Sequence, residues 1–228
     1  MRAVVLQEYG GPEKLKFEDN VLEPQISAGT VLIATAAASV NPIDWKMRSG
    51  MRQKDFPLSF PAILGRDVSG VVRAVGASVK HFKPGDRVLA LSNATYAELV
   101  AVDDSDVTHL PDRVDLVDAA AIPLIALTGD QLVRFATNVQ KGQVVLVTGA
   151  LGSVGRAAVH TAKKIGALTL PSESVSHNWL YFVVVVAVDK WEAAFAFHLS
   201  IACFHPSHGV NLRSLPCCDS SLVQTALG

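Results

Sequence analysis

The segment whose residues could do the most specific chemistry is a glycine turn between an apolar strand and a helix. Val144–Thr148 is a continuous apolar run, typical of a strand buried on both faces of a parallel sheet. After the turn, apolar residues recur at helical spacing as far as Gly166, and this glycine suits the C-terminal cap of a helix. Backbone N–H groups and the positive end of the helix attract a pyrophosphate, so we predict dinucleotide binding. The residues that would bind it are Gly149, Ala150, Leu151, Gly152, Ser153, Val154 and Gly155.

Two glycines of this turn have separate expected roles. Gly152 lets the backbone approach a phosphate without a Cβ in the way, and Gly155 lets the helix pack close to the strand. The first glycine of the usual G-x-G-x-x-G pattern is Ala150 here, with Gly149 one place earlier. The alternative is a glycine-rich turn between strand and helix that binds no ligand.

The sequence after this helix departs from a dinucleotide-binding unit. Residues 168–170 could begin a second strand, but Pro171 removes a hydrogen-bond donor that a central strand needs. Glu173 lies about twenty residues past the glycine turn, where an acidic residue would bind a ribose hydroxyl. Because no convincing strand carries Glu173, we give it little weight. We also expect Val144–Thr148 to lack a partner strand downstream.

The elements before the turn are predicted to be mainly short strands, which favours a partly open barrel or sandwich. Glycine and proline turn signals separate them. The expected strands are Ala3–Leu6, 31–40, 68–75, Arg87–Leu91 and 96–102. Two helices are then expected, at 116–122 and 123–135, with Pro123 in the first turn of the second.

Composition excludes several classes of protein. Half of the 228 residues are apolar and the formal net charge is −1, which argues against a disordered chain and against a nucleic-acid partner. The three cysteines all lie in the last 26 residues, so no disulfide framework is expected. The first residues turn polar at Gln7, too early for a signal peptide, and we expect a cytoplasmic location.

The composition changes after residue 167. Charged residues are sparser there than in the preceding part, and two apolar blocks lie at 180–188 and 193–204. Each block is shorter than the roughly 20 residues that a membrane-spanning helix needs, and charges separate them, so no membrane partner is expected. The blocks could supply a substitute strand and helix, or be translation of an unspliced or frame-shifted segment. The same region contains possible zinc ligands, but accidental clustering is the favoured interpretation and no metal is expected. These residues are Cys203, His205, His208, Cys217 and Cys218.

Several motifs in order give the chain a family resemblance over its first 167 residues. The motifs lie at 8–12, 40–46, 60–70, 82–88 and 121–128, and the glycine turn completes the set. Together they resemble the zinc-independent, zeta-crystallin-like quinone oxidoreductases of the medium-chain dehydrogenase/reductase superfamily. The resemblance implies an α/β plus β fold. A GroES-like partly open β-barrel at 1–122 precedes an incomplete Rossmann domain (a doubly wound parallel sheet) that starts at 123–167, and a divergent tail fills 168–228. The chain would then be truncated after the first Rossmann β-α step, without the second strand that selects NADPH or NADH.

The resemblance also implies an activity and site residues. NADPH would deliver hydride to a quinone or an activated C=C bond, and a homodimer is possible. Zinc-using relatives place a cysteine where Asn41 stands and a His-Glu pair where Arg66 and Asp67 stand, so zinc is not expected. Asn41 would be the catalytic residue, beside the nicotinamide and the substrate oxygen. The other implied contacts are Thr128 with the nicotinamide, and Asp44, Trp45 and Met47 with the substrate.

Each of these residues also has a structural interpretation. Asn41 and Asp44 suit the N-cap and third position of a helix, and Thr128 could bond back to a helix carbonyl. Asp67 is interpreted as a structural hydrogen-bonding carboxylate, and core packing would explain Trp45 and Met47 equally well. The alternative to an enzyme is an inactive GroES-like binding protein that does not hold the cofactor productively.

Overall fold

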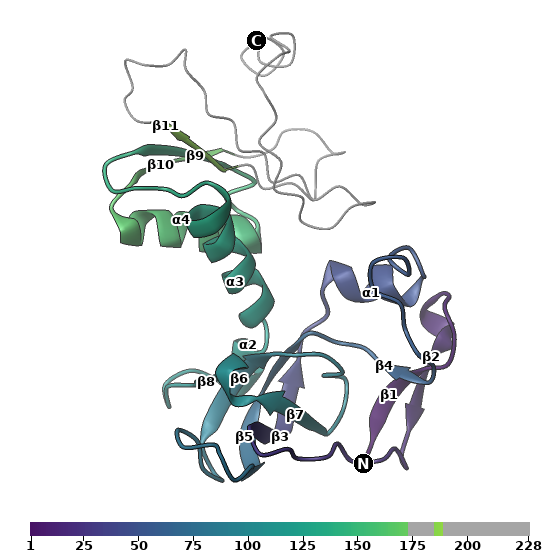
Figure 1. Ribbon diagram of the computed structural model, residues 1–228. Coiled ribbons are helices and arrows are strands. Elements are labelled where there is room, and N and C mark those ends of the chain that lie inside the picture. Colours follow the sequence, from purple (N-terminus) through teal and green to yellow (C-terminus); the bar gives the residue numbers. More distant parts are fainter. Residues whose placement is uncertain (173–184, 189–228) are drawn as a thin grey trace. The chain divides into compact units, whose positions relative to one another are not determined.

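The computed structural model describes residues 1–172 and 185–188 of the chain. The chain divides into two compact units after Leu124, and the described residues of the second unit are 125–172 and 185–188. Figure 1 labels the helices and strands of both units. The boundary between the units lies two residues after the boundary expected from the sequence.

The first unit is built on a five-stranded antiparallel sheet with the order β7-β3-β5-β6-β8. Its two longest strands pair along their length and carry alternating β-branched residues, whose side chains form the core with those of the neighbouring strands. Val31, Ile33, Val68 and Val88 are fully buried in that core. The strands are β3 (Thr30–Ala38), β5 (Asp67–Val75), β6 (Arg87–Leu91), β7 (Leu99–Asp103) and β8 (Val107–His109).

A second, three-stranded antiparallel sheet with the order β2-β1-β4 completes the barrel-like unit. Its strands are β1 (Ala3–Leu6), β2 (Leu15–Glu18) and β4 (Ala62–Ile63). The sequence predicts β1, but not β2, β4 or β8. Strand β7 begins three residues later than predicted, because Tyr96 accepts a hydrogen bond from the Val4 N–H at 2.8 Å and Ala97 bridges to Ala3.

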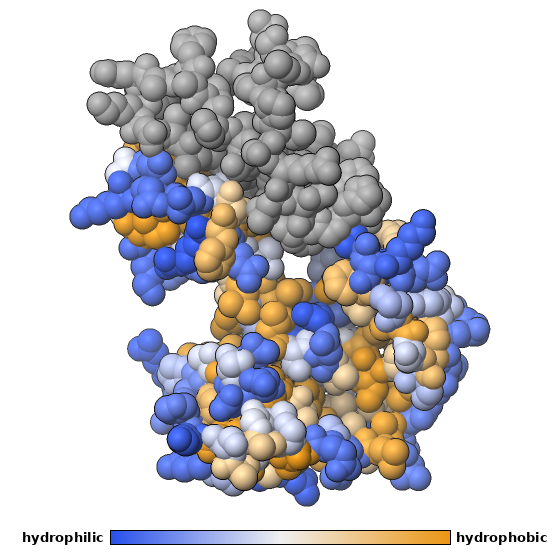
Figure 2. Space-filling view, in the orientation of Figure 1, coloured by the Kyte–Doolittle hydropathy of each residue, from blue (hydrophilic) through white to orange (hydrophobic). Residues whose placement is uncertain are grey.

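Helices connect and follow these sheets. Helix α1 (Pro42–Arg48) lies in the first unit, and α2 (Leu116–Ala119), α3 (Pro123–Gln131) and a π-helical turn (Leu132–Ala136) follow the barrel. Figure 2 shows apolar side chains around the α2–α3 stretch, and its exposed large apolar residues are Val117, Ile122 and Leu127. Among the described residues, Leu116–Ala136 is the one helical stretch long and apolar enough to cross a membrane, a criterion that core helices of soluble proteins also meet.

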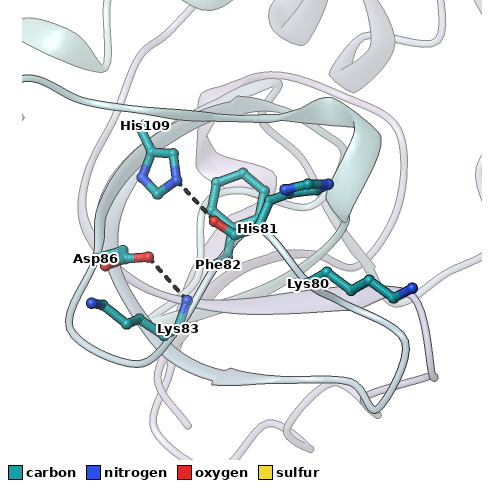
Figure 3. Close-up of a pocket in the computed structure, with 6 residues that line it drawn as sticks. All are labelled: Lys80, His81, Phe82, Lys83, Asp86 and His109. Carbon is teal, nitrogen blue, oxygen red and sulfur yellow. Dashed lines mark hydrogen bonds between the residues drawn. The ribbon is translucent and has the colours of Figure 1, made fainter.

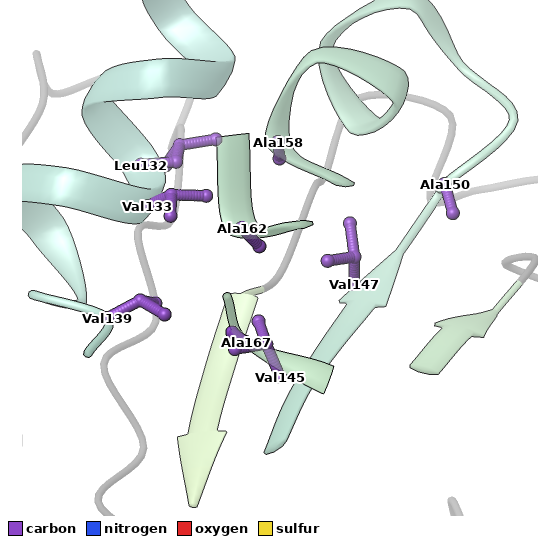
Figure 4. Packing of buried hydrophobic residues seen from close by; sticks show 9 residues of the cluster. All are labelled: Leu132, Val133, Val139, Val145, Val147, Ala150, Ala158, Ala162 and Ala167. Atoms are coloured by element: carbon purple, nitrogen blue, oxygen red, sulfur yellow. The ribbon is translucent and has the colours of Figure 1, made fainter. Parts of the chain in front are cut away.

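The second unit contains a β-α-β unit with parallel strands. Strand β9 (Val144–Thr148), helix α4 (Ser153–Ile165) and strand β10 (Leu168–Ser172) follow one another, and β10 pairs in parallel with β9. The inner side chains of β9 pack against small residues of α4 and against the π-helical turn (Figure 4). The close packing follows from the alanines on the inner face of α4, and Gly166 ends the helix with a φ of +91°, as predicted.

Strand β9 has partners on both sides, so the expectation that it lacks a downstream partner is wrong. β10 lies on one side and β11 (Val185–Val188) pairs antiparallel on the other. The second Rossmann strand, predicted to be absent, is therefore present, and block 180–188 supplies a further strand.

Proline 171 is compatible with β10 because of the strand's register. The Leu168 N–H donates to the Gln143 carbonyl at 2.8 Å, and the Ser172 carbonyl accepts from the Ala150 N–H at 3.2 Å. The backbone groups of the even-numbered residues therefore face β9, while those of Pro171 face away. The missing N–H removes no bond to β9, which sequence rules alone could not show.

Candidate functional site

The glycine turn between β9 and α4 adopts the conformation that its glycines allow. Gly149 has a φ of +63°, in the left-handed region that favours glycine. The Gly152 N–H donates to the Gly149 carbonyl at 3.0 Å and closes the turn. Ala150, which stands where the usual pattern has its first glycine, is buried, and its N–H donates to the end of β10. The turn is thus fixed by both strands.

Gly155 allows α4 to lie against this turn. A Cβ at Gly155 would be 2.1 Å from the Gly149 carbonyl oxygen and 2.8 Å from the Ala150 Cα, distances that no real side chain tolerates. A Cβ at Gly152 would be 3.2 Å from the same oxygen, a much milder contact. The predicted packing role of Gly155 is confirmed, and Gly152 leaves the outer side of the turn open.

The N-terminus of α4 has the properties of an anion site. Gly152 is its N-cap, no side chain caps it, and its first turn contains no acidic residue. Leu151, Gly152 and Ser153 are exposed, so the first N–H groups of the helix are accessible. Because those N–H groups carry the positive end of the helix dipole, the turn can accept a phosphate.

In the first unit, Asn41 begins helix α1 as its N-cap, with Pro42 in the first position. The Asp44 carboxylate accepts a hydrogen bond from the Asn41 backbone N–H at 2.7 Å. The predicted helix start is therefore confirmed. Asn41 is 7% exposed, so little of it faces solvent.

The side chain of Asn41 is held by two neighbours. Its amide nitrogen donates to an Asp67 carboxylate oxygen at 2.8 Å and to the Ser39 hydroxyl at 2.9 Å. The carboxylate only accepts, so the amide nitrogen must face it. The Ser39 hydroxyl also donates to the same Asp67 oxygen, so these three groups form one compact hydrogen-bonded cluster that fixes the Asn41 amide.

Asp67, at the start of β5, is the centre of a buried network. It is fully buried and accepts hydrogen bonds from Ser39, from Asn41 and, through its other oxygen, from the Leu124 N–H at 2.8 Å. Its interpretation as a structural hydrogen-bonding carboxylate is confirmed. It joins the end of β3, the start of α1 and the first turn of α3.

Asp44 is the second buried acid of this region. It is 3% exposed, and besides the Asn41 N–H it accepts from the Tyr96 hydroxyl at 2.9 Å. Burial raises the pKa of Asp44, and the negative charge of Asp67 adds to the rise, while the two hydrogen bonds and Arg66 oppose it. Burial and the two acids also raise the pKa of Tyr96 well above its ordinary value. Sequence reasoning missed Tyr96, because no local spacing links residues 52 positions apart.

The remaining predicted contacts are separate from this network. Trp45 and Met47 are half-buried on α1, and the Lys46 ammonium lies 5.7 Å from the centroid of the Trp45 ring. Thr128 is half-buried in α3 and precedes Gly129, where a Cβ would lie 2.6 Å from that of Ala157 on α4. Contact of these side chains with a substrate or a nicotinamide stays a prediction.

A pocket of about 280 Å³ lies elsewhere in the first unit and is lined by none of the predicted residues (Figure 3). His109 bonds the His81 carbonyl at 3.0 Å, and its ring lies 4.6 Å from that of Phe82. The Lys83 N–H donates to Asp86 at 3.0 Å, and the two lysine side chains of the pocket point away from each other. These contacts stabilise the turn before β6 and do not form a convergent site.

The cysteine and histidine cluster of the tail, which contains possible zinc ligands, lies outside the described residues. Within 1–172 and 185–188, no group of three or more histidine, cysteine or acidic side chains could hold a metal ion.

Comparison with known proteins identifies the chain. The family model of the alcohol dehydrogenase GroES-like domain matches residues 27–112. The chain is 39% identical to human quinone oxidoreductase over 168 residues, which cover 73% of this chain and 50% of that protein. It is 35% identical to the chloroplastic NADPH-dependent alkenal/one oxidoreductase of Arabidopsis thaliana over 201 residues, 83% of this chain and 51% of the relative. The chain belongs to the medium-chain dehydrogenase/reductase superfamily.

The structural comparison agrees with this assignment to the superfamily. A mycobacterial protein solved with NADPH superposes with a TM-score of 0.66 and 34% identity over 77% of this chain and 54% of that chain. The match confirms the GroES-like fold followed by the start of a Rossmann domain. The chain spans about half the length of the curated relatives it matches.

Proposed function

We propose that this superfamily member is an NADPH-dependent, zinc-independent oxidoreductase that transfers hydride to a quinone or an α,β-unsaturated carbonyl compound. The observation that carries the proposal is the open turn between β9 and α4, with Gly155 packed beneath it and an uncapped helix N-terminus. The names of relatives support the reaction class, since they include quinone and alkenal/one oxidoreductases.

The chain's residues have defined tasks in this proposal. The N–H groups of the turn from Leu151 to Val154 would hold the pyrophosphate, with Gly152 leaving room for it. When bound, NADPH supplies the hydride. Asn41, fixed by Asp67, would lie beside the nicotinamide and accept hydrogen bonds through its amide oxygen.

Zinc independence is supported by the chemistry of the side chains at the positions where, by the family resemblance, zinc-using relatives have their metal ligands. The Asn41 amide and the Asp67 carboxylate are bonded to each other, and Arg66 adds a permanent positive charge. Of the three residues, Asp67 alone carries a common zinc-ligand group, and its two oxygens already accept three hydrogen bonds.

Fluorescence titration of the purified chain with NADPH, and separately with NADH, tests the proposal. We expect saturable binding that weakens about tenfold or more in Gly152→Val, because the new side chain enters the phosphate position. Gly29→Val is the matched control, since a Cβ there meets nothing within 4 Å. Binding is followed by assays with a simple quinone and an enone. Absence of binding of either nucleotide at millimolar concentration would refute the proposal.

A further inference from the structure

A buried acid beside the Asn41 network has an oxygen without a hydrogen-bond partner. The Oδ2 atom of Asp44 accepts from the Asn41 N–H and from the Tyr96 hydroxyl. Its Oδ1 atom is buried and has no hydrogen-bond partner in the part of the chain that the structure describes. A charged carboxylate with one unsatisfied, buried oxygen is costly, whereas a neutral carboxylic acid is much less so.

The neighbouring charges favour the neutral acid at the same place. Asn41 links two carboxylates, because its backbone N–H donates to Asp44 and its side-chain amide donates to Asp67. Asp67 accepts three hydrogen bonds with both of its oxygens, whereas Asp44 has one oxygen left over. If the pair holds one proton, that proton belongs on Asp44.

Tyr96 is the more exposed member of the contact with Asp44. Its side chain is half-buried, whereas Asp44 is 3% exposed. Gly65 lets the phenol ring lie close, since a Cβ there would be 2.6 Å from a ring carbon of Tyr96. Of the two groups that donate to Asp44, the Tyr96 hydroxyl is the titratable one, so it is the contact through which the buried acid can exchange a proton.

We propose that Tyr96 is the catalytic acid of the reaction and that Asp44 is the buried proton reservoir behind it. This inference depends on the proposed function. Hydride addition to the β-carbon of an enone leaves an enolate. The Tyr96 O–H bond then breaks and its proton forms a C–H bond at the α-carbon. The Asp44 proton moves to the phenol oxygen. After the product leaves, a proton from water enters at the phenol oxygen, hydroxide remains in the solvent, and the phenol proton returns to the Asp44 carboxylate.

The hydrogen bonds of Asn41 support this assignment. Asn41 is the polar residue that the family resemblance puts beside the substrate oxygen, yet a carboxamide does not titrate, and its nitrogen is held by Ser39 and Asp67. A proton for the reduced acceptor has to come from another group. The titratable or charged side chains that interact with Asp44 are Tyr96, Asp67 and Arg66, and of these the phenol is in direct hydrogen-bond contact.

The first test needs no turnover. Aspartate carboxyl groups are followed by ¹³C NMR during a pH titration of the full chain, and Asp44→Asn assigns the signal of Asp44. We expect this signal to titrate above the ordinary aspartate range, and to move higher still in Tyr96→Phe, which removes a hydrogen bond that favours the charged form. Asp112→Asn, at an exposed position, should leave the signal unchanged. A signal at or below the ordinary value would overturn the inference.

The second test follows where the proton goes. Reduction of an α-substituted enone in D₂O should place deuterium on one face of the α-carbon in the natural protein and in Asp112→Asn. Tyr96→Phe and Asp44→Asn should lose this preference and about a hundredfold in kcat/KM. In the natural protein, kcat/KM should fall as the pH rises through the pKa of Asp44, because the proton reservoir is then empty. Asp44→Asn should not show this fall. Retained facial preference in both variants would overturn the inference.

The two proposals fail in different ways. If the natural chain reduces no acceptor, the proposed function is refuted and the proton-donor role with it, although the NMR titration still reports the state of Asp44. If the natural chain is active and both Tyr96→Phe and Asp44→Asn behave like it, only the role of this pair is refuted.

Discussion

Replacement of Gly155 by alanine is the most direct test of how the glycine turn is built. The new Cβ would lie 2.1 Å from the Gly149 carbonyl oxygen, well over an ångström inside an ordinary contact of 3.4–4 Å. Both nearby atoms belong to the backbone, so α4 itself must move away from the turn. Overpacking of this kind costs about 1–3 kcal/mol, and the better helix propensity of alanine returns at most about 1 kcal/mol.

We expect Gly155→Ala to lower the free energy of unfolding of the second unit by about 1–2 kcal/mol, or its Tm by about 5–10 °C. Thermal unfolding followed by circular dichroism measures the change. Gly152→Ala is the control in the same turn, because its Cβ meets the same oxygen at 3.2 Å, and it should change stability by no more than about 0.5 kcal/mol. If Gly155→Ala has the same Tm as the natural protein, α4 does not pack against the turn as described.

Three further predictions concern the same two regions. Gly129→Ala should destabilise the second unit by about 2 kcal/mol, because its Cβ would meet the Ala158 nitrogen and the Val154 oxygen at 2.7 Å; unchanged thermal unfolding would contradict this. Asp67→Asn should cost about 3 kcal/mol in urea unfolding, because an amide cannot accept all three hydrogen bonds; a loss below about 1 kcal/mol would show that the network is not stabilising. The pKa of Asp44 is raised in the folded protein, so the unfolded state releases its proton first and stability falls as pH rises above the ordinary value of 3.8. Asp44→Asn should not show the part of this loss of stability that comes from Asp44. If the free energies of unfolding in urea of the natural protein and of Asp44→Asn change in parallel with pH, the pKa shift of Asp44 is refuted.

The local parts of both regions could be predicted from the sequence. The glycine turn, the cap at Gly166 and the start of α1 at Asn41 depend on residues a few positions apart, and local rules describe such contacts well. The contacts of Ser39 with Asp67 and of Asp44 with Tyr96 depend on strands that meet only in the folded barrel. A single sequence contains no spacing that reveals them.

For strand β10, a local rule gave the wrong prediction. The rule that a proline argues against a central strand was applied to Pro171 without knowledge of the register of the strand. A proline argues against a central strand only when its missing N–H would have faced a neighbour. The sequence does not say which alternate residues of 168–172 face β9, so the strand could be judged only from its pairing.

The outward register of Pro171 has a consequence for association between chains. Along the side of β10 that faces away from β9, the backbone groups belong to Thr169 and Pro171. Of the described residues of β10, only Thr169 can offer an N–H there, so a strand from another molecule would find half of the donors that it needs along this strand. This border of the sheet is therefore a poor template for the unwanted sheet extension that leads to fibres and precipitates.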